Sequence, residues 1–223
     1  MICMTANSLP VSHEALTAAA QDTSLPDQIL SLWFGSARPG NADALKHKAQ
    51  WFTKSAAFDE ELRQRFGTAV EAALGGALQH WATQGPWQQL ALVILLDQFT
   101  RNIHRNTPKS FAGDAQALAL ALQAVDCGSD RLLPEVARVF MYLPLEHAED
   151  PAMQQRSVAA FEALLQNATD AELREYLAGT LDYAHRHQVV IERFCRFPHR
   201  NSILGRTSTA EEAEYLAQPG SGF

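Results

Sequence analysis

The segment from Pro86 to about Asn102 constrains the fold most, because it is apolar on nearly every side of a helix. Leu90, Val93 and Ile94 form one helical stripe, and further leucine, phenylalanine and isoleucine residues cover much of the rest. A helix that is apolar on most sides usually lies in the centre of its domain. Proline is also favoured at the first position of a helix. The sequence therefore predicts a central helix around which the other segments pack.

Two charged residues continue the apolar stripe of this central helix. Asp97 and Arg101 are four positions apart, so they can pair along one helix face. Burial of a charge is costly unless the charge is paired. The pair therefore indicates either a structural network that orients neighbouring helices or part of a functional site. Both interpretations stay open, because buried ion pairs serve structure as often as chemistry.

Nearly every other readable period in the chain is also helical. We expect helices over residues 26–34, 41–83 with a break near Ser55 or Gly67, 111–127, 134–145, 151–167, 170–194 and 209–217. The later helices carry start signals: Pro134 and Pro151 as first helical residues, and two capping boxes, Thr169 with Glu172 and Ser208 with Glu211. No stretch combines β alternation with hairpin turn residues. The fold class is therefore predicted to be all-α.

Length and composition predict one folded domain with an acidic surface. The chain has 223 residues, and we expect a leader over residues 1–24 and a single helical domain over 25–223. Its 47% hydrophobic and 19% charged residues are typical of a globular protein. A net charge of −7 argues against nucleic acid as a partner. The longest apolar run, Leu90 to Leu96, is far shorter than the ~20 residues that span a bilayer, so no membrane partner is predicted.

The cysteines indicate a reducing compartment. Cys3, Cys127 and Cys195 are widely spaced, and no two of them have the spacing of metal ligands. An odd number of scattered cysteines does not suggest a disulfide framework. The first twenty residues lack the basic and continuous apolar regions of a secretory signal. We therefore expect a cytoplasmic protein.

A second polar cluster, residues 146–150, follows a helix that Pro144 is expected to interrupt. Asp150 precedes Pro151 and is predicted to cap the next helix. His147 stands where the chain turns, so its side chain could point into a cleft. The carboxylates near it could also hold a metal, but their spacing matches no standard ligand motif. No metal site is predicted, and the sequence names no cofactor.

A third polar cluster lies at the end of the helix expected over residues 170–194. His187 shares a face with apolar residues such as Leu177 and Ile191, so it is predicted to point inward. An inward histidine is more often a hydrogen-bonded core residue than a base. The segment 185–206 holds five arginines and one acid, Glu192. A local cationic patch on an acidic protein suits a small anion better than a polyanion.

These clusters also carry a family resemblance. From about residue 27 to its end, the chain resembles the DUF924 family of bacterial and fungal proteins, whose function is unassigned. The resemblance rests on Leu32 to Gly35, on Leu95 to Phe99 with Arg101, Asn102 and Arg105, on Phe111 with Asp114, on Leu143 and Pro144 with His147, Glu149, Asp150 and Gln154, on His187, on Arg193 to Asn201 without Cys195, on Leu204 to Arg206, and on Gly222 and Phe223. The family is grouped with tetratricopeptide-like folds, which implies stacked antiparallel helix pairs.

The chain departs from the usual family pattern at four positions. Thr100, Asn106, Ala148 and Cys195 stand where family members usually have proline, glycine, serine and glycine. Asn106 is expected to keep the turn, because asparagine tolerates the left-handed conformation better than most residues. Ala148 has no hydroxyl, so it excludes a serine nucleophile at that position.

Three interpretations of function remain, of which a ligand site is favoured. Arginine forks bind phosphate or carboxylate, and histidine exchanges protons near neutral pH. The predicted catalytic residues are Asp97, His147, His187 and His199. The predicted ligand-binding residues are Arg101, Asn102, Arg105, Arg196, Arg200, Asn201 and Arg206.

The predicted ligand is a small anionic molecule. The first alternative is a tetratricopeptide-like scaffold that captures a peptide carboxylate. The second is a buried structural network without a ligand. An enzyme or ligand-binding protein should gather the polar residues in one pocket, whereas a scaffold should spread them along an open groove.

Overall fold

The computed structural model describes residues 24–222, and within that range every regular element is helical. The all-α prediction is confirmed. The α-helices are α2 (Ser24–Phe34), α3 (Asn41–Leu45), α4 (Lys48–Trp51), α5 (Ala56–Leu74), α6 (Pro86–Val93), α7 (Thr100–Ile103), α8 (Asp114–Cys127), α9 (Glu135–Glu146), α10 (Pro151–Asn167), α11 (Ala171–Phe194) and α12 (Ala210–Leu216). The 3₁₀-helices are η1 (Gln79–Thr83), η3 (Pro108–Phe111), η4 (Ser129–Leu132) and η5 (Pro198–Arg200), and η2 (Ile94–Phe99) is a π-helix. The predicted leader, apart from its last residue, lies outside the described residues.

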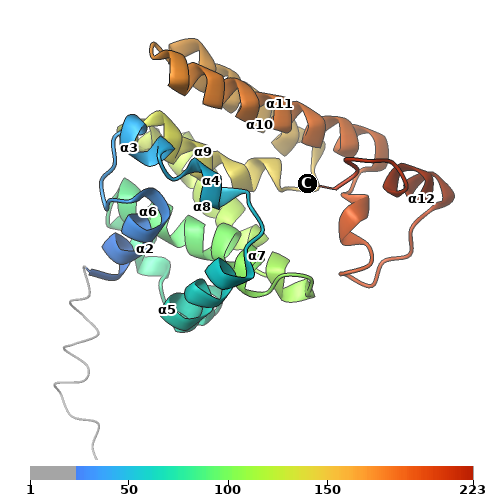
Figure 1. Cartoon of the computed structure of the whole chain (residues 1–223), viewed down its shortest axis with the longest axis horizontal. Coiled ribbons are helices and arrows are strands. Elements are labelled where there is room, and N and C mark those ends of the chain that lie inside the picture. Colours follow the sequence, from blue (N-terminus) through green and yellow to red (C-terminus); the bar gives the residue numbers. More distant parts are fainter. Residues whose placement is uncertain (1–23, 223) are drawn as a thin grey trace, which may run out of the picture.

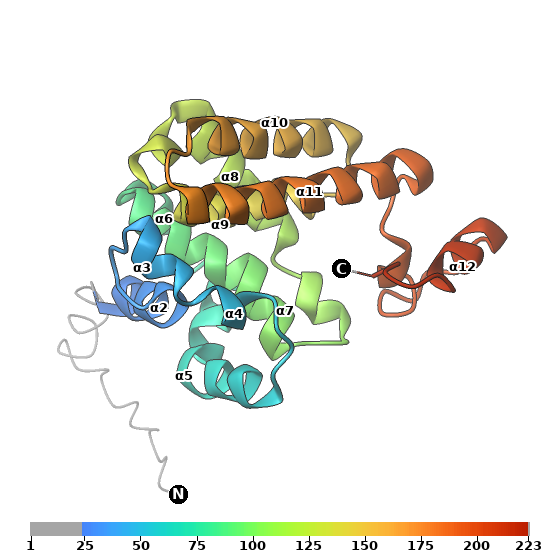
Figure 2. The same cartoon turned by 45° about the horizontal axis from the view of Figure 1, so that its top comes forward.

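The helices pack around α9. On one side of it, α10 and α11 lie side by side as an antiparallel pair (Figures 1 and 2). The helices α6 and α8 also contact α9, while α2 packs on α6 and α5 packs on η2 and α7. The short helix α12 stands apart from this body, beyond the end of α11 (Figure 1). The antiparallel pair fits the expected stacking, but the tetratricopeptide-like architecture stays a prediction.

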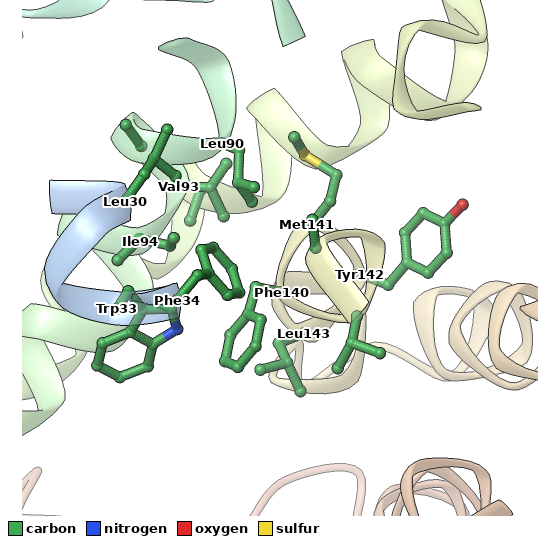
Figure 3. Close-up of a cluster of buried hydrophobic side chains, with 14 of the residues drawn as sticks. Leu30, Trp33, Phe34, Leu90, Val93, Ile94, Phe140, Met141, Tyr142 and Leu143 are labelled. Carbon is green, nitrogen blue, oxygen red and sulfur yellow. The ribbon is translucent and has the colours of Figure 1, made fainter. Parts of the chain in front are cut away.

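The predicted central helix is buried as expected. Every residue from Leu90 to Leu96 is at most 1% exposed. Figure 3 shows how side chains of this segment meet Trp33 and Phe34 from α2 and Phe140 from α9. The ring centroids of Trp33 and Phe140 are 5.5 Å apart in an edge-to-face arrangement, which is favourable for aromatic pairs. This aromatic contact joins α2 to α9.

The central helix differs from the single α-helix expected over residues 86–102. After α6 the backbone widens into a π-helix, η2, before it returns to α-helical geometry in α7. π-Helical turns are rare in proteins, and those that occur are often found at functional sites. Gly113 packs on η2 so closely that a Cβ atom would lie 2.1 Å from the carbonyl oxygen of Leu96. Only glycine permits this approach, which brings Asp114 at the start of α8 beside Arg101.

Helix boundaries follow the sequence signals with small shifts. The break near Ser55 is confirmed, because Ser55 caps α5 by accepting a hydrogen bond from the Phe58 amide, whereas Gly67 lies inside α5. Asp150 caps α10 as predicted. Pro134 precedes α9 as its capping residue rather than as its first helical residue.

The caps of α11 and α12 lie one residue later than the two predicted capping boxes, and only α12 has a complete capping box. Asp170, not Thr169, accepts the hydrogen bond from the Leu173 amide. Thr209 and Glu212, not Ser208 and Glu211, form the capping box of α12. Neighbouring residues with similar side chains compete for a cap, and tertiary contacts decide between them.

Pro144 does not interrupt its helix, because α9 continues to Glu146. Proline in the last turn removes one hydrogen bond, the one that the carbonyl of residue 140 would accept. The helix therefore carries Glu146 and His147 to the point where α9 ends.

Two residues that lack glycine's freedom adopt left-handed backbone conformations. Asn106 has a φ of 62° and Cys195 a φ of 56°. Both stand where the resembled family usually has glycine. The expectation that Asn106 keeps the turn is confirmed, and Cys195 ends α11 in the same conformation. Phe223, which is part of the family resemblance, lies outside the described residues.

Candidate functional site

A cavity of about 780 Å³ lies where four stretches of chain meet. Its walls come from the segment 48–54, the end of the central helix with η3, the end of α9, and α11 with the loop that follows it. Gly222 also lines it, and the chain returns from α12 toward the body of the molecule (Figure 2). The volume is typical of pockets for small molecules. Seven predicted site residues line it: Arg101, Asn102, Arg105, His147, His187, His199 and Arg200.

Asp97 lies behind this wall and is fully buried. One carboxylate oxygen is 2.7 Å from Nδ1 of His147 and 3.1 Å from the Arg101 guanidinium, and the other accepts a 2.6 Å hydrogen bond from Gln98. Burial alone would raise the pKa of Asp97, but the Arg101 charge and the hydrogen bonds from His147 and Gln98 hold that pKa well below its ordinary value. Asp97 is therefore ionised at neutral pH.

The ionised Asp97 determines the tautomer of His147. A carboxylate can only accept hydrogen bonds, so Nδ1 of His147 carries the hydrogen and Nε2 keeps its lone pair. Burial and the Arg101 charge lower the pKa of His147, although Asp97 opposes this. His147 is therefore a neutral imidazole with a fixed orientation.

Two arginines share one carboxylate at the next part of the wall. Arg101 forms a fork on Asp114, with distances of 2.8 and 3.0 Å. Arg200 reaches the same carboxylate at 3.4 Å and donates a 3.1 Å hydrogen bond to the carbonyl oxygen of His147. Its guanidinium carbon lies 4.8 Å from the ring centre of Phe111 and 4.5 Å from that of Phe197. The Arg200 charge is thus held between aromatic rings with weak carboxylate pairing.

The positive charge of Arg200 has fewer anionic partners than that of Arg101. Its side chain is 8% exposed, and its Nε atom has no hydrogen-bond partner among residues 24–222. Burial lowers the pKa of Arg200 to about 10, with a further contribution from the Arg101 charge. The guanidinium still carries its charge at neutral pH, so an additional anion would stabilise it.

Glu146 and His187 form a second buried pair on the cavity wall. Nδ1 of His187 is 2.9 Å from the carbonyl oxygen of Tyr183 and 3.2 Å from a Glu146 carboxyl oxygen. Burial and the Asp97 charge raise the pKa of Glu146 to about 8. Burial and the nearby His147 lower the pKa of His187 to about 3. Both groups are uncharged at neutral pH, and the inward orientation predicted for His187 is confirmed.

The remaining predicted site residues on the cavity wall are His199, Asn102 and Arg105. Burial and the Arg200 charge lower the pKa of His199 to about 4. Arg105 forms a fork on Asp59 with distances of 2.8 and 2.9 Å, and Asn102 donates a 2.8 Å hydrogen bond to the same carboxylate. These two residues therefore also join the end of the central helix to α5.

Three predicted ligand-binding residues lie away from the cavity wall. Arg196 pairs with both carboxylate oxygens of Glu212, at 2.6 and 2.7 Å. Arg206 forms a similar fork on Glu149, at 2.7 and 2.9 Å. Asn201 donates a hydrogen bond to the Ser208 hydroxyl at 3.0 Å. Their contacts hold the segment that follows α11, which supplies His199 and Arg200 to the cavity.

Comparison with known proteins identifies the family. The model of DUF924, described as a bacterial protein of unknown function, matches residues 29–220. The chain belongs to the DUF924 family. A solved structure of a protein of unknown function from Agrobacterium tumefaciens is 38% identical to this DUF924 chain, with a TM-score of 0.73, and the match covers 87% of this chain and 97% of that one. No curated protein matches the sequence.

Several residues on or behind the wall of this DUF924 cavity were not predicted as site residues. Glu146 stands next to His147 in the sequence, and Asp114 belongs to a family motif, so the sequence does carry a signal for each of them. Tyr176 lies on the predicted inward face of its helix. Trp51 gave no signal, because an aromatic residue in a short helix is more often part of the core.

The structure also limits other kinds of site in this DUF924 protein. In the described range, no group of three or more histidine, cysteine, aspartate or glutamate side chains is placed to hold a metal ion. None of the helices between residues 24 and 222 combines the length and hydrophobicity needed to cross a bilayer.

Proposed function

We propose that this DUF924 protein binds a small molecule that carries a carboxylate or phosphate group, in the cavity of about 780 Å³. The observation that carries the proposal is Arg200, a buried guanidinium on the cavity wall with an incomplete set of partners. Arginine binds carboxylate and phosphate through paired hydrogen bonds. A ligand anion would supply the compensation that Asp114 gives mainly to Arg101.

Another part of the cavity wall suits an apolar ligand body. Trp51, Phe52 and Tyr176 line the cavity, and the rings of Trp51 and Tyr176 have centroids 6.0 Å apart. The Tyr176 hydroxyl is buried and has no hydrogen-bond partner in the described part of the chain. Buried polar groups are rarely left without a partner. The proposed ligand therefore combines an anionic end at Arg200 with an apolar body and a group that accepts from Tyr176.

The distribution of the polar residues favours a small ligand over a peptide. Seven of the eleven predicted residues line one cavity, a distribution that supports a small-ligand site. A scaffold would present them along an open groove. The exposed thiols of Cys127 and Cys195 are free, which suits the reducing cytoplasm where we place the protein.

The test is a thermal-shift screen with inorganic phosphate, phenyl phosphate, succinate and benzoate. A ligand at ~100 times its dissociation constant stabilises the folded state by roughly 2.7 kcal/mol. We expect at least one of these anions to raise the Tm of the wild type. The shift should disappear in Arg200→Gln and persist in part in Arg200→Lys, which keeps the charge but loses the fork.

Arg186→Gln is the matched control, because Arg186 pairs with Asp182 on the exposed surface of α11. It should respond to anions as the wild type does. If none of the four anions shifts the wild type, or if folded Arg200→Gln responds fully, the proposal is wrong.

A further inference from the structure

We propose that the cavity is also an active site, in which His147, oriented by Asp97, removes a proton from a water molecule that attacks an ester of an anionic acid. This inference rests on the proposed function, because Arg200 has to hold the anionic substrate beside His147. It adds a reaction class, general-base hydrolysis, to the binding role.

The geometry of the Asp97–His147 pair carries the proposal. The 2.7 Å contact to Nδ1 comes from a carboxylate that two further donors, Arg101 and Gln98, hold in place. A base whose ring is held by a buried carboxylate points its other nitrogen in a fixed direction. Among residues 24–222 the structure gives Nε2 of His147 no hydrogen-bond partner, and His147 lines the cavity. The imidazole is thus positioned to accept a proton from a molecule in the cavity.

A cation lies next to this base. The Arg200 guanidinium donates its 3.1 Å hydrogen bond to the backbone oxygen of His147, so the cation lies beside the residue that carries the base. Positive charge beside the reacting carbonyl stabilises the oxyanion that forms during ester hydrolysis, and it does so most strongly in a site that excludes water. His147 and Arg200 therefore provide the two functions that such a hydrolysis requires.

Water is a better nucleophile here than a side chain. Residue 148 is alanine, so no hydroxyl follows His147 in the chain. The Ser110 hydroxyl on the cavity wall donates to the carbonyl of Thr107 at 2.7 Å, and that of Thr180 donates to the carbonyl of Leu177 at 2.9 Å. Neither hydroxyl directs its hydrogen to His147, which disfavours a covalent intermediate on these residues.

The proposed step balances without a co-reactant. The water oxygen forms a bond to the carbonyl carbon of the ester while its proton moves to Nε2 of His147. The carbon–oxygen bond to the leaving group then breaks, and the proton on His147 is transferred to the leaving oxygen. The products are a carboxylic acid and an alcohol, and Arg200 stabilises the charged oxygen between the two stages.

Charged and titratable groups from six elements surround His147 and set its pH response. They are Asp97 from η2, Arg101 from α7, Asp114 from α8, His187 and its partner Glu146 from α11 and α9, and His199 and Arg200 at η5. Burial and Arg101 dominate and lower the pKa of His147. The rate of hydrolysis should therefore rise with pH at a midpoint below about 6.5, the ordinary value for histidine, and level off near neutrality.

The experiment uses 4-nitrophenyl hydrogen succinate, an ester that carries a free carboxylate, with neutral 4-nitrophenyl acetate for comparison. The activated leaving group needs no acid, so the rate reports the base. We expect the wild type to hydrolyse the succinate ester faster than the acetate. His147→Gln should lower that rate by about 10²- to 10⁴-fold, as is usual for loss of a general base. His185→Gln, which changes an exposed histidine on α11, should hydrolyse it as the wild type does.

Asp97→Asn tests the positioning role, with ¹⁵N NMR of His147 as a second measurement. In the wild type the hydrogen should reside on Nδ1, and in the variant both tautomers should appear while the rate falls. A His147→Gln variant that hydrolyses the succinate ester at the wild-type rate, including the case in which neither exceeds the background, overturns the proposal. If anions still stabilise His147→Gln in that case, the proposed binding function stands and only the hydrolysis is wrong. If anions do not stabilise the wild type either, both proposals are wrong.

Discussion

Asp97 keeps its charge in the interior because donors from three residues reach its carboxylate. A buried carboxylate is costly when it lacks partners, and the cost falls as hydrogen bonds and opposite charges collect around it. Arg101 and Gln98 come from the same helix, but His147 lies 50 positions away. The ionisation state of Asp97 is therefore a property of the folded chain.

Glu146, unlike Asp97, is protonated and uncharged at neutral pH, and its pH response tests the electrostatics of the site. Its pKa rises from about 4.5 in the unfolded chain to about 8 in the fold because of burial and the Asp97 charge. The fold favours the protonated carboxyl, so this contribution to stability is full below pH 4.5 and is lost as the pH rises through 8. Glu146→Gln removes the titration and keeps the shape.

We therefore expect the free energy of unfolding of the wild type to fall relative to Glu146→Gln between pH 5 and pH 8. The relative loss should be at most about 1.4 kcal/mol per pH unit. Urea unfolding of both proteins across this range measures it. Glu162→Gln, at an exposed position of α10, should keep the wild-type pH dependence. Parallel curves for the wild type and Glu146→Gln would contradict a neutral Glu146.

At the scale of elements, the chain uses unusual backbone turns to bring polar residues to the cavity. The π-helix η2 carries Asp97 and Gln98, and the close approach of Gly113 places α8 against it. The end of α11 depends on Cys195, whose left-handed conformation starts the loop that leads to His199 and Arg200. A residue with a Cβ atom is strained in that conformation.

Replacement of Cys195 by glycine should therefore stabilise the protein. Glycine adopts a φ of 56° without the steric cost that Cβ imposes, and it is the residue most often found where helices end this way. We expect a gain on the order of 1 kcal/mol in the free energy of unfolding, measured by urea denaturation.

Cys127→Gly is the matched control, since Cys127 is the last residue of α8 and the left-handed position that follows it is already glycine. That change should destabilise the protein, because glycine is unfavourable within a helix. Equal effects at both cysteines would show that the conformation of Cys195 carries no cost.

At the scale of the whole molecule, the segment after α11 is a separate wall of the cavity. It is attached to the body through Glu149, which accepts the Arg206 fork and a 2.8 Å hydrogen bond from the Phe197 amide. It is attached to α12 through Glu212, whose pKa falls to about 2 mainly because of its hydrogen bond with Arg196. The position of Arg200 therefore depends on contacts outside the cavity.

Glu149→Gln should loosen this segment without unfolding the protein. The amide keeps the shape but loses the charge that pairs with Arg206 and one acceptor oxygen. We expect faster hydrogen exchange in residues 195–212, unchanged exchange in α10, and a smaller anion-induced Tm shift, because Arg200 would be held less firmly. Asp126→Asn, which removes a surface pair with Arg156, should change none of these. Equal hydrogen-exchange rates for residues 195–212 in the wild type and in Glu149→Gln would show that Glu149 does not anchor the segment.

What the sequence determined by itself is local. The helical class, the central helix, the cap at Asp150 and the reach of Arg101 to Asp97 depend on spacing within a few residues, and periodicity and helix geometry report such spacing directly. The inward face of α11 also follows from its period, which is why His187 was placed correctly. The family motifs indicated which polar residues belong to the site, but not which of their side chains contact one another.

The tertiary structure alone decided which arginines reach the cavity and which protons the site holds. Arg196, Arg200 and Arg206 lie in the segment that follows α11, where no long helix has a period that would assign their directions. Glu212 and Glu149, from other parts of the chain, hold Arg196 and Arg206 outside, while the rings of Phe111 and Phe197 hold Arg200 on the wall. Burial and charges that come together only on folding likewise set the states of Glu146 and His147, because electrostatic energies depend on distance in space and on exclusion of water.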